Sequence, residues 1–131
     1  MSEKLKNVVE AALAAGAQSD AEAAMAMFSP EVIAHCPASL PFGGDHRGID
    51  SYLQALAALN RYYTLDVTDS SVLATDSERV MLLLDIVYTA PTTGRSARQQ
   101  CIEVLTFTGE KVSDVAVYYR DSAELLNLLQ P

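Results

Sequence analysis

The spacing of hydrophobic positions divides the chain into a half of helical character and a half of strand character. Early apolar residues recur every three or four positions, which is typical of helices with one buried face. Later apolar runs are separated by short turn-like segments, which is typical of strands. The predicted helices cover residues 2–15, 20–28, 49–59 and 122–129, and the predicted strands cover residues 32–36, 62–73, 79–88, 97–108 and 112–120. This order, α-α-β-α-β-β-β-β with a short C-terminal helix, predicts one α+β domain over residues 1–131, and the short turns favour a mostly antiparallel sheet.

The strand predicted at residues 79–88 is apolar on both of its faces. One face consists of Val80, Leu82, Leu84 and Ile86, and the other of Met81, Leu83, Asp85 and Val87. Because an antiparallel sheet with one wet face alternates between apolar and polar residues, both faces of this sheet need a cover. We expect helices to cover the face with Leu83, which then lines a pocket. We expect a second copy of the chain to cover the row with Leu82, which gives a homodimer.

Residues 32–48, VIAHCPASLPFGGDHRG, combine four different local signals in one short stretch. An apolar strand ends near Pro37, because proline cannot donate to a sheet ladder. A second proline and a Gly-Gly pair exclude a continuous helix through the segment that follows. A polar cluster, Asp45-His46-Arg47, then leads through Gly48 into the third helix. A strand end, an apolar lip and a helix start in this order predict the rim of a pocket.

Composition excludes several classes of function. The chain has 131 residues, 50% hydrophobic and 20% charged, and a net charge of −8, which makes nucleic acid and anionic membranes poor partners. No apolar run approaches the roughly 18 residues of a membrane span. The first residues are amphipathic and carry acids, unlike a signal peptide, and Cys36 and Cys101 have no metal-ligand or disulfide spacing. We therefore expect a cytoplasmic protein with free thiols and with neither a metal nor another cofactor.

Several segments together resemble a known family. They are Met27-Phe28-Ser29-Pro30-Glu31, His35-Cys36-Pro37, Leu40-Pro41-Phe42-Gly43-Gly44, Arg47-Gly48 and Tyr118-Tyr119-Arg120-Asp121. Over nearly its whole length the chain is similar to the SnoaL-like branch of the nuclear-transport-factor-2-like superfamily. The resemblance implies a cone-shaped, curved sheet wrapped around helices, with an internal apolar pocket, and dimers are common in this superfamily. Its members include polyketide cyclases, ketosteroid isomerases, limonene epoxide hydrolases and non-catalytic ligand binders.

Matching the chain to these enzymes residue by residue narrows the expected chemistry. The oxyanion-binding tyrosine of the isomerases falls on Ala12 and their general base on Cys36, which leaves only Glu103 as a counterpart of their protonated aspartate. Asp85 matches the aspartate of the epoxide hydrolases, but Leu83 stands where they have an arginine. In the SnoaL-like cyclases a pocket carboxylate acts as acid and base without a cofactor, and Asp121 is the first candidate for that role.

Two acids interrupt apolar strands and are candidates for catalysis. Glu103 lies within Cys101-Ile102-Glu103-Val104-Leu105, so that a pocket there would raise the pKa of its carboxyl by desolvation. The alternative is an ion pair with Arg98 or Lys111. Asp85 is equally isolated and is either paired, protonated or exposed to water. If both acids share the concave face, they form a coupled carboxyl pair.

Two further residues are catalytic candidates with structural alternatives. His35 is a possible general base near neutral pH, although a lone His on a strand is more often structural. Asp121, followed by Ser122-Ala123-Glu124, also has the pattern of a helix cap. The residues expected to line the ligand pocket are Cys36, Phe42, Tyr52, Leu83, Val115, Val117 and Tyr119. The sequence thus predicts a cofactor-free acid/base enzyme, of cyclase or isomerase type, for a hydrophobic polyketide-, steroid- or terpenoid-like substrate. The alternatives are a non-catalytic ligand-binding or accessory domain and an enzyme like the epoxide hydrolases.

Overall fold

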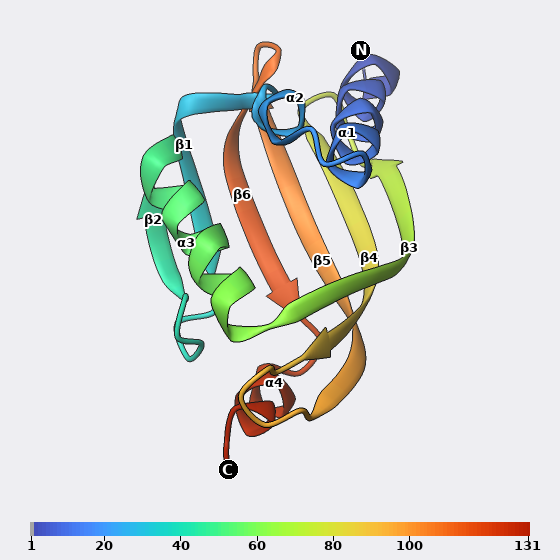
Figure 1. Cartoon of the computed structure of the whole chain (residues 1–131). Coiled ribbons are helices and arrows are strands. Elements are labelled where there is room, and N and C mark those ends of the chain that lie inside the picture. Colours follow the sequence, from blue (N-terminus) through green and yellow to red (C-terminus); the bar gives the residue numbers. More distant parts are fainter. Residues whose placement is uncertain (1) are drawn as a thin grey trace.

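The computed structural model describes residues 2–131 and contains one six-stranded curved sheet with helices along its inner side (Figure 1). The strand order is β2-β1-β6-β5-β4-β3. The helices are α1 (Ser2–Ala17), α2 (Ala21–Met25), α3 (Ile49–Tyr62) and α4 (Ser122–Leu128). The strands are β1 (Phe28–Cys36), β2 (Gly44–Arg47), β3 (Thr64–Ala74), β4 (Arg79–Thr89), β5 (Ser96–Thr108) and β6 (Lys111–Tyr119). The predicted α+β class and the mostly antiparallel, curved sheet are confirmed.

The sheet contains one parallel contact that the short turns of the sequence do not predict. Strands β3 to β6 pair in sequence as antiparallel neighbours, and β2 pairs antiparallel with β1. Strand β1 lies parallel to β6, with Ile33 opposite Asp114 and His35 opposite Ala116. This contact joins the first and last large segments of the sheet, so that the pocket rim in residues 32–48 lies beside the final strand.

The second helix is shorter than predicted, and the first strand is longer. Helix α2 ends at Met25, whereas the helical pattern continues to Phe28. The reason is a backbone hydrogen bond of 2.8 Å from Val112 N to Met27 O, which draws the chain into the sheet before the helical pattern ends. Strand β1 therefore begins at Phe28 and includes Pro30, in a region where its register with β6 shifts between Phe28 and Ile33. Proline is tolerated at such an irregularity.

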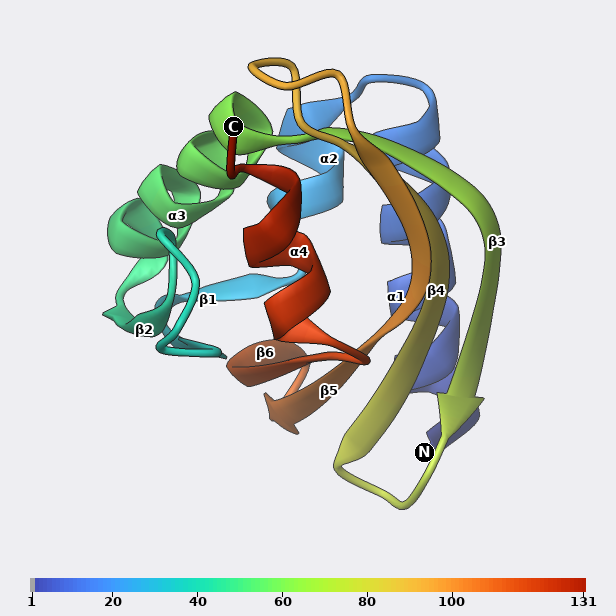
Figure 2. The same cartoon turned by 90° about the horizontal axis from the view of Figure 1, so that it is seen from below.

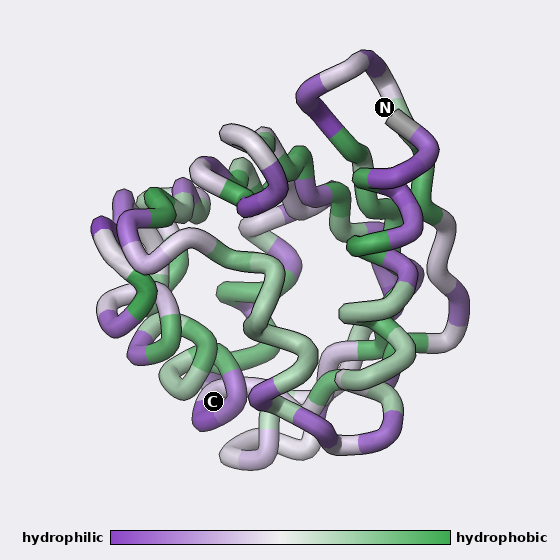
Figure 3. The backbone as a smooth tube through the Cα atoms, turned by 90° about the horizontal axis from the view of Figure 1, so that it is seen from above, coloured by the Kyte–Doolittle hydropathy of each residue, from purple (hydrophilic) through white to green (hydrophobic). Residues whose placement is uncertain are grey.

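Strand curvature wraps the sheet around the helices on its concave side (Figure 2). Helix α1 packs against β3 and β4, and α3 packs against β1, while α4 lies at the opposite end of the sheet from α1 and α2 (Figure 1). Seen from above, hydrophobic segments occur on all sides of the ring that helices and strands form (Figure 3). The buried side chains of α1, α3 and the concave face of the sheet form one core.

The apolar row of Val80, Leu82, Leu84 and Ile86 lies on the concave face, and the prediction that it forms a dimer interface is wrong. These four side chains are between 0 and 8% exposed beneath the helices. Side chains alternate between the two faces along β4 as predicted. Because both sets of side chains are apolar, the sequence pattern does not indicate which face the helices cover. Met81 and Leu83, which alternate with this row, are only partly buried and lie on the convex face.

Glycines shape the lip between β1 and β2. A Cβ atom on Gly43 would lie 1.9 Å from the carbonyl oxygen of Pro37, so no other residue permits this close approach. Gly48 precedes α3 with a φ of 88°, a conformation that favours glycine. The backbone bond from Gly48 N to Val32 O, 2.7 Å long, ties this turn to β1. The lip is therefore held in place at both of its ends.

Candidate functional site

The concave side of the sheet carries two neighbouring apolar pockets, which share two lining residues and which we call the two compartments of one cavity open to solvent. The larger compartment, of about 510 Å³, lies among α1, α2 and strands β3 to β5. The smaller one, of about 40 Å³, lies between α3, the lip and strand β6. The larger is lined by Val9, Ala12, Leu13, Gly16, Ala17, Ala24, Met25, Met27, Phe28, Tyr52, Val67, Ser70, Leu82, Leu84 and Glu103. The smaller is lined by Cys36, Phe42, Tyr52, Ala55, Leu56, Leu59, Glu103, Val117 and Tyr119. Among residues 2–131, Tyr52 and Glu103 alone line both compartments.

Glu103 lies at the boundary between the two compartments without a partner. On β5 it stands between Leu82 of β4 and Val117 of β6 in the sheet register. Within residues 2–131 its carboxylate accepts no hydrogen bond and forms no ion pair. Burial in this apolar environment raises the pKa of Glu103 from 4.5 to about 7. The carboxyl can therefore exist as acid or as base near neutral pH.

The two cations that could have paired with Glu103 are engaged elsewhere. The guanidinium of Arg98 lies 3.3 Å from Asp85 Oδ2, on the convex side of the sheet. The ammonium of Lys111 donates to the backbone oxygen of Ala26, 2.5 Å away. Because neither side chain reaches the cavity, no Lys, Arg or His lines either compartment in the described part of the chain.

The polar side chains nearest to Glu103 are uncharged at neutral pH. Burial, and then the charge of Glu103, raises the pKa of Cys36 to about 11. The same two causes raise the pKa of Tyr52 above its ordinary value of 10. Burial also raises the pKa of Cys101 and of Tyr119. Among these groups Glu103 alone changes its charge near neutral pH.

A set of aromatic rings closes the cavity toward α4. Phe42 of the lip packs edge-to-face on Tyr63 and on Tyr119, with ring centroids 6.3 and 6.2 Å apart. Tyr88 packs in the same way on Tyr63 and on Tyr119, at 6.0 and 6.1 Å. The Tyr63 hydroxyl donates to the Leu125 oxygen of α4 at 2.6 Å, whereas the buried Tyr88 hydroxyl has no hydrogen-bond partner in residues 2–131. These rings place the apolar face of the lip over the smaller compartment.

His35 lies on the convex face, away from the cavity. Its Nδ1 atom is 2.8 Å from Asp45 Oδ1, and its Nε2 atom is 2.7 Å from Asp114 Oδ1. The hydrogen bond with Asp45 and then that with Asp114 raise the pKa of His35 above 6.5. The structure therefore places His35 in a surface bridge across β2, β1 and β6, and separates it from Glu103. Its neighbour Cys36 points to the other side and lines the smaller compartment.

Asp85 and Leu83 also lie on the convex face, so the expectation that Leu83 lines the pocket is wrong. Both border an open cleft on that face, together with Arg98 and Arg120. Side chains alternate along β4, and Leu82 and Leu84 already occupy the concave positions. Because Asp85 and Glu103 face opposite sides of the sheet, they do not form the coupled carboxyl pair considered above. The Asp85 carboxylate pairs with Arg98 instead.

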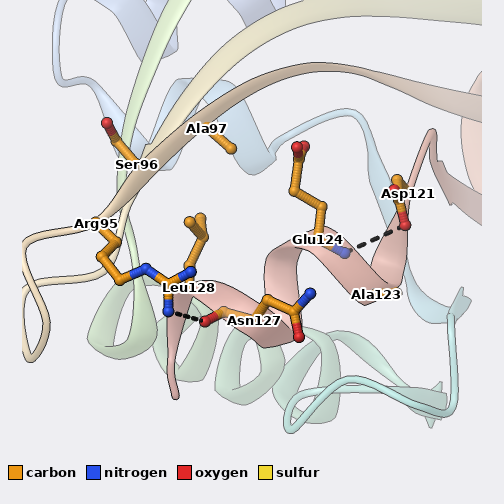
Figure 4. A pocket seen from close by; sticks show the side chains of 8 residues that line it. All are labelled: Arg95, Ser96, Ala97, Asp121, Ala123, Glu124, Asn127 and Leu128. Atoms are coloured by element: carbon orange, nitrogen blue, oxygen red, sulfur yellow. Dashed lines mark hydrogen bonds between the residues drawn. The ribbon is translucent and has the colours of Figure 1, made fainter. Parts of the chain in front are cut away.

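Asp121 caps the last helix at the end of the sheet near α4. Its side chain accepts a hydrogen bond of 3.2 Å from Glu124 N, which is the capping geometry (Figure 4). Gln99 supports the same turn, since its Nε2 atom donates to Asp121 O at 3.1 Å and to Glu124 Oε1 at 2.8 Å. The open cleft beside this helix, of about 400 Å³, is lined by neither Glu103 nor Tyr52. The structure thus separates Asp121 from the cavity.

The remaining pocket candidates lie on the concave side, and the sequence missed several lining residues. Phe42, Tyr52, Val117 and Tyr119 line the cavity, whereas Val115 is fully buried in the core and lines neither compartment. Among the lining residues that the sequence missed are Leu82 and Leu84, which the sequence prediction places on the other face, and the small residues Ala12, Gly16, Ala17 and Ala24 of the first two helices, which leave the space of the larger compartment. The signal of these small residues in the sequence is the high alanine content of residues 11–26.

Among residues 2–131 no cluster of His, Cys, Asp and Glu could hold a metal ion, and no helix is long and apolar enough to cross a membrane.

The chain matches one family of protein domains in sequence and several solved structures in fold. The model of the SnoaL-like domain family matches residues 9–115. An NTF2-like protein of unknown function from Burkholderia pseudomallei is similar in structure, with a TM-score of 0.85 and 20% identity over 98% of both chains. A candidate polyketide cyclase from Xanthomonas campestris has a TM-score of 0.80 and 19% identity, again over 98% of both chains. TerC, co-crystallised with polyporic acid, has a TM-score of 0.83 and 16% identity over 98% of this chain and 99% of its own. No curated protein sequence matches the chain.

Proposed function

The chain belongs to the SnoaL-like domain family, and on that premise we propose that it binds a hydrophobic small molecule in the concave cavity and exchanges one proton with it through Glu103. The observation that carries this proposal is an unpaired carboxyl, with a pKa raised to about 7, at the boundary of an apolar cavity. A general acid or base works best when its pKa lies near the working pH. The larger compartment, of about 510 Å³, lies in the size range of ligand sites in proteins.

The reaction type proposed is a cofactor-free isomerisation or cyclisation of a polyketide-, steroid- or terpenoid-like molecule. In such a reaction Glu103 takes a proton from one carbon or oxygen of the ligand and returns it at another, so that no net charge or electron leaves the site. The hydroxyl of Tyr52, which lines both compartments, is available as a hydrogen-bond donor beside it. The similarity to a candidate polyketide cyclase supports this type of chemistry, and TerC supports the binding of a small molecule.

Binding without turnover is the second candidate, and a specific observation favours it. His35, Asp85 and Asp121 all lie outside the cavity, so Glu103 has no second acid or base that titrates near neutral pH. An enzyme that must protonate one atom while deprotonating another commonly uses two such groups. The chemistry open to this site is therefore limited to what one shuttling carboxyl can do.

A ligand screen in deuterated water separates the two candidates. Polycyclic aromatic, steroid and terpenoid compounds are first ranked by the shift that they cause in melting temperature. The ligands that bind are then incubated with the protein and followed by proton NMR. Incorporation of deuterium or a new product with the wild type, lost in Glu103→Gln and retained in Glu31→Gln, supports proton transfer. A ligand that binds but stays unchanged identifies a binding domain, and the absence of any ligand in the cavity overturns both.

A further inference from the structure

We infer that the ligand carries a basic nitrogen, and that a hydrophobic amine is bound as an ammonium ion against the Glu103 carboxylate. The inference rests on the proposed function, because it names the class of molecule that occupies the same cavity. It follows from the charges that face the cavity, from the hydrogen-bond acceptors available there and from the composition of the walls.

Only negative charge is available inside the cavity. No cationic side chain lines either compartment, and the five other titratable groups around Glu103 are neutral thiols and phenols: Cys36, Tyr52, Tyr88, Cys101 and Tyr119. A carboxylate ligand would meet a like charge with nothing to compensate it. A cation supplies the partner that Glu103 lacks, and charge-assisted hydrogen bonds are about twice as strong as neutral ones. The net charge of −8 attracts cations to the protein in addition.

The lining of the larger compartment offers acceptors for the protons of an ammonium group. Backbone oxygens of β3 to β6 take part in the sheet ladders, so we consider the side chains. The lining offers the Glu103 carboxylate and the hydroxyl oxygens of Tyr52 and Ser70. A primary ammonium group has three N–H donors, and each buried donor without an acceptor costs free energy. The two carboxylate oxygens and the two hydroxyl oxygens are enough for the three N–H donors of a primary ammonium group as well as for the single N–H of a tertiary one.

The apolar walls of the larger compartment suit the hydrocarbon substituents of such a nitrogen. Apart from Glu103, Tyr52 and Ser70 the larger compartment is lined by aliphatic, small and aromatic residues, so that hydrocarbon substituents lose no hydrogen bond there. The rings of Phe28 and Tyr52 pack edge-to-face at 5.4 Å, and both line this compartment. Aromatic faces attract organic cations, more strongly where water is excluded. With the ammonium beside it, Glu103 stays ionised at neutral pH, because an opposite charge nearby favours the carboxylate.

Isosteric probes test the inference. N,N-dimethyl-1-(naphthalen-2-yl)methanamine is compared with 2-isobutylnaphthalene, in which a C–H group replaces the nitrogen, and with 2-naphthylacetate as the anion. Binding is measured by naphthalene fluorescence and calorimetry at neutral pH. We expect the amine to bind at least tenfold more tightly than the hydrocarbon and the acetate not to bind. Glu103→Gln abolishes the preference for the amine, and Glu31→Gln, an exposed carboxyl-to-amide change of equal charge, preserves it.

Each other result has a defined meaning. If the hydrocarbon binds as tightly as the amine, or if Glu103→Gln keeps the preference, the inference about nitrogen is overturned, while binding of hydrophobic ligands in the cavity stands. If a neutral probe binds in the cavity with no dependence on Glu103, the role of this carboxyl in the proposed function fails as well.

Discussion

Two acidic residues on the convex face of the sheet are paired with cations, whereas Glu103 on the concave face is not paired with any cation that the structure describes. On the convex face Asp85 is paired with Arg98, and Asp114 is paired with His35, in contact with solvent. On the concave face Glu103 lies among apolar residues, and no partner for it exists within residues 2–131. All three acids interrupt strands that are largely apolar in sequence. Apolar neighbours in the sequence are common to all three acids. What distinguishes Glu103 as the candidate for function is that it has no partner in the part of the chain that the structure describes.

The largest expected difference between the faces concerns packing. Leu105, fully buried on the concave face, and Leu83, partly buried on the convex face, allow the same substitution to be compared. We expect Leu105→Ala to lower the free energy of unfolding by about 2–5 kcal/mol, because it leaves a cavity in the core. Leu83→Ala in the monomer costs under about 1 kcal/mol. Denaturant titration of both variants measures the difference, and equal losses would contradict the assignment of faces.

The second prediction concerns the pH dependence that Glu103 imposes on stability. A carboxyl with a pKa of about 7 when folded and 4.5 when unfolded opposes folding increasingly from pH 4.5 to about pH 7, and by a constant amount above. The difference between the two pKa values corresponds to roughly 3–4 kcal/mol. Glu103→Gln is therefore expected to raise the melting temperature at pH 8 and to leave it nearly unchanged at pH 4. A variant that is clearly less stable than the wild type at pH 8 would show that Glu103 has a stabilising partner.

The third prediction concerns the cover of the convex face. Tyr118 and Leu73 are 59% and 50% exposed there, and Met81, Leu83, Ile102 and Val104 complete an apolar surface between them. We propose that a second copy of the chain covers this surface, so that light scattering gives about twice the 14.1 kDa of one chain. Tyr118→Asp is expected to weaken the dimer by about 1–2 kcal/mol or more, as removal of an aromatic interface residue does. Tyr62→Asp, an exposed tyrosine on α3, is the control and leaves the mass unchanged.

The smallest expected effect is at Asp121, outside the cavity. Its side chain caps α4, so Asp121→Ala is expected to lower the stability by about 1 kcal/mol and Asp121→Asn by much less. Neither variant is expected to change ligand binding or proton exchange in the cavity. Thermal unfolding combined with the NMR assay measures both quantities. Loss of proton exchange in a stably folded Asp121→Asn variant would return this carboxylate to the candidate catalytic groups.

The sequence predicts the elements better than it predicts their environment. The periodicity locates all of the longer strands, because β4 and β5 are long runs of strand-forming residues. It misses β2, since a four-residue polar strand has no periodicity of its own. It could not assign the faces, because Leu82 and Leu83 are equally apolar. It also could not show that Asp45 and Asp114 lie on either side of His35, which depends on a parallel contact between strands far apart in the chain.

For the candidate site, the sequence identifies side chains but not the space between them. Glu103, Tyr52, Cys36 and Phe42 come from four separate elements, and only the curvature of the sheet brings them to one cavity. The volume of the larger compartment depends on what the helices lack, namely large side chains at Ala12, Gly16 and Ala24. Such absences carry no periodic signal, because a small residue is compatible with core, surface and cavity alike.

The parallel contact between β1 and β6 sets the order in which the protein can be completed during synthesis. Strand β1 is made first, but its partner β6 is made only after β2, α3 and strands β3 to β5. Until then β1 pairs only with the short strand β2, and its other edge presents unpaired backbone groups beside apolar side chains. Unpaired edges of this kind promote aggregation, and pairing over such a long stretch of chain slows folding. Truncation within β6 therefore leaves an open sheet edge. We expect it to lower yield and solubility more than the loss of a segment of this size would elsewhere in the chain.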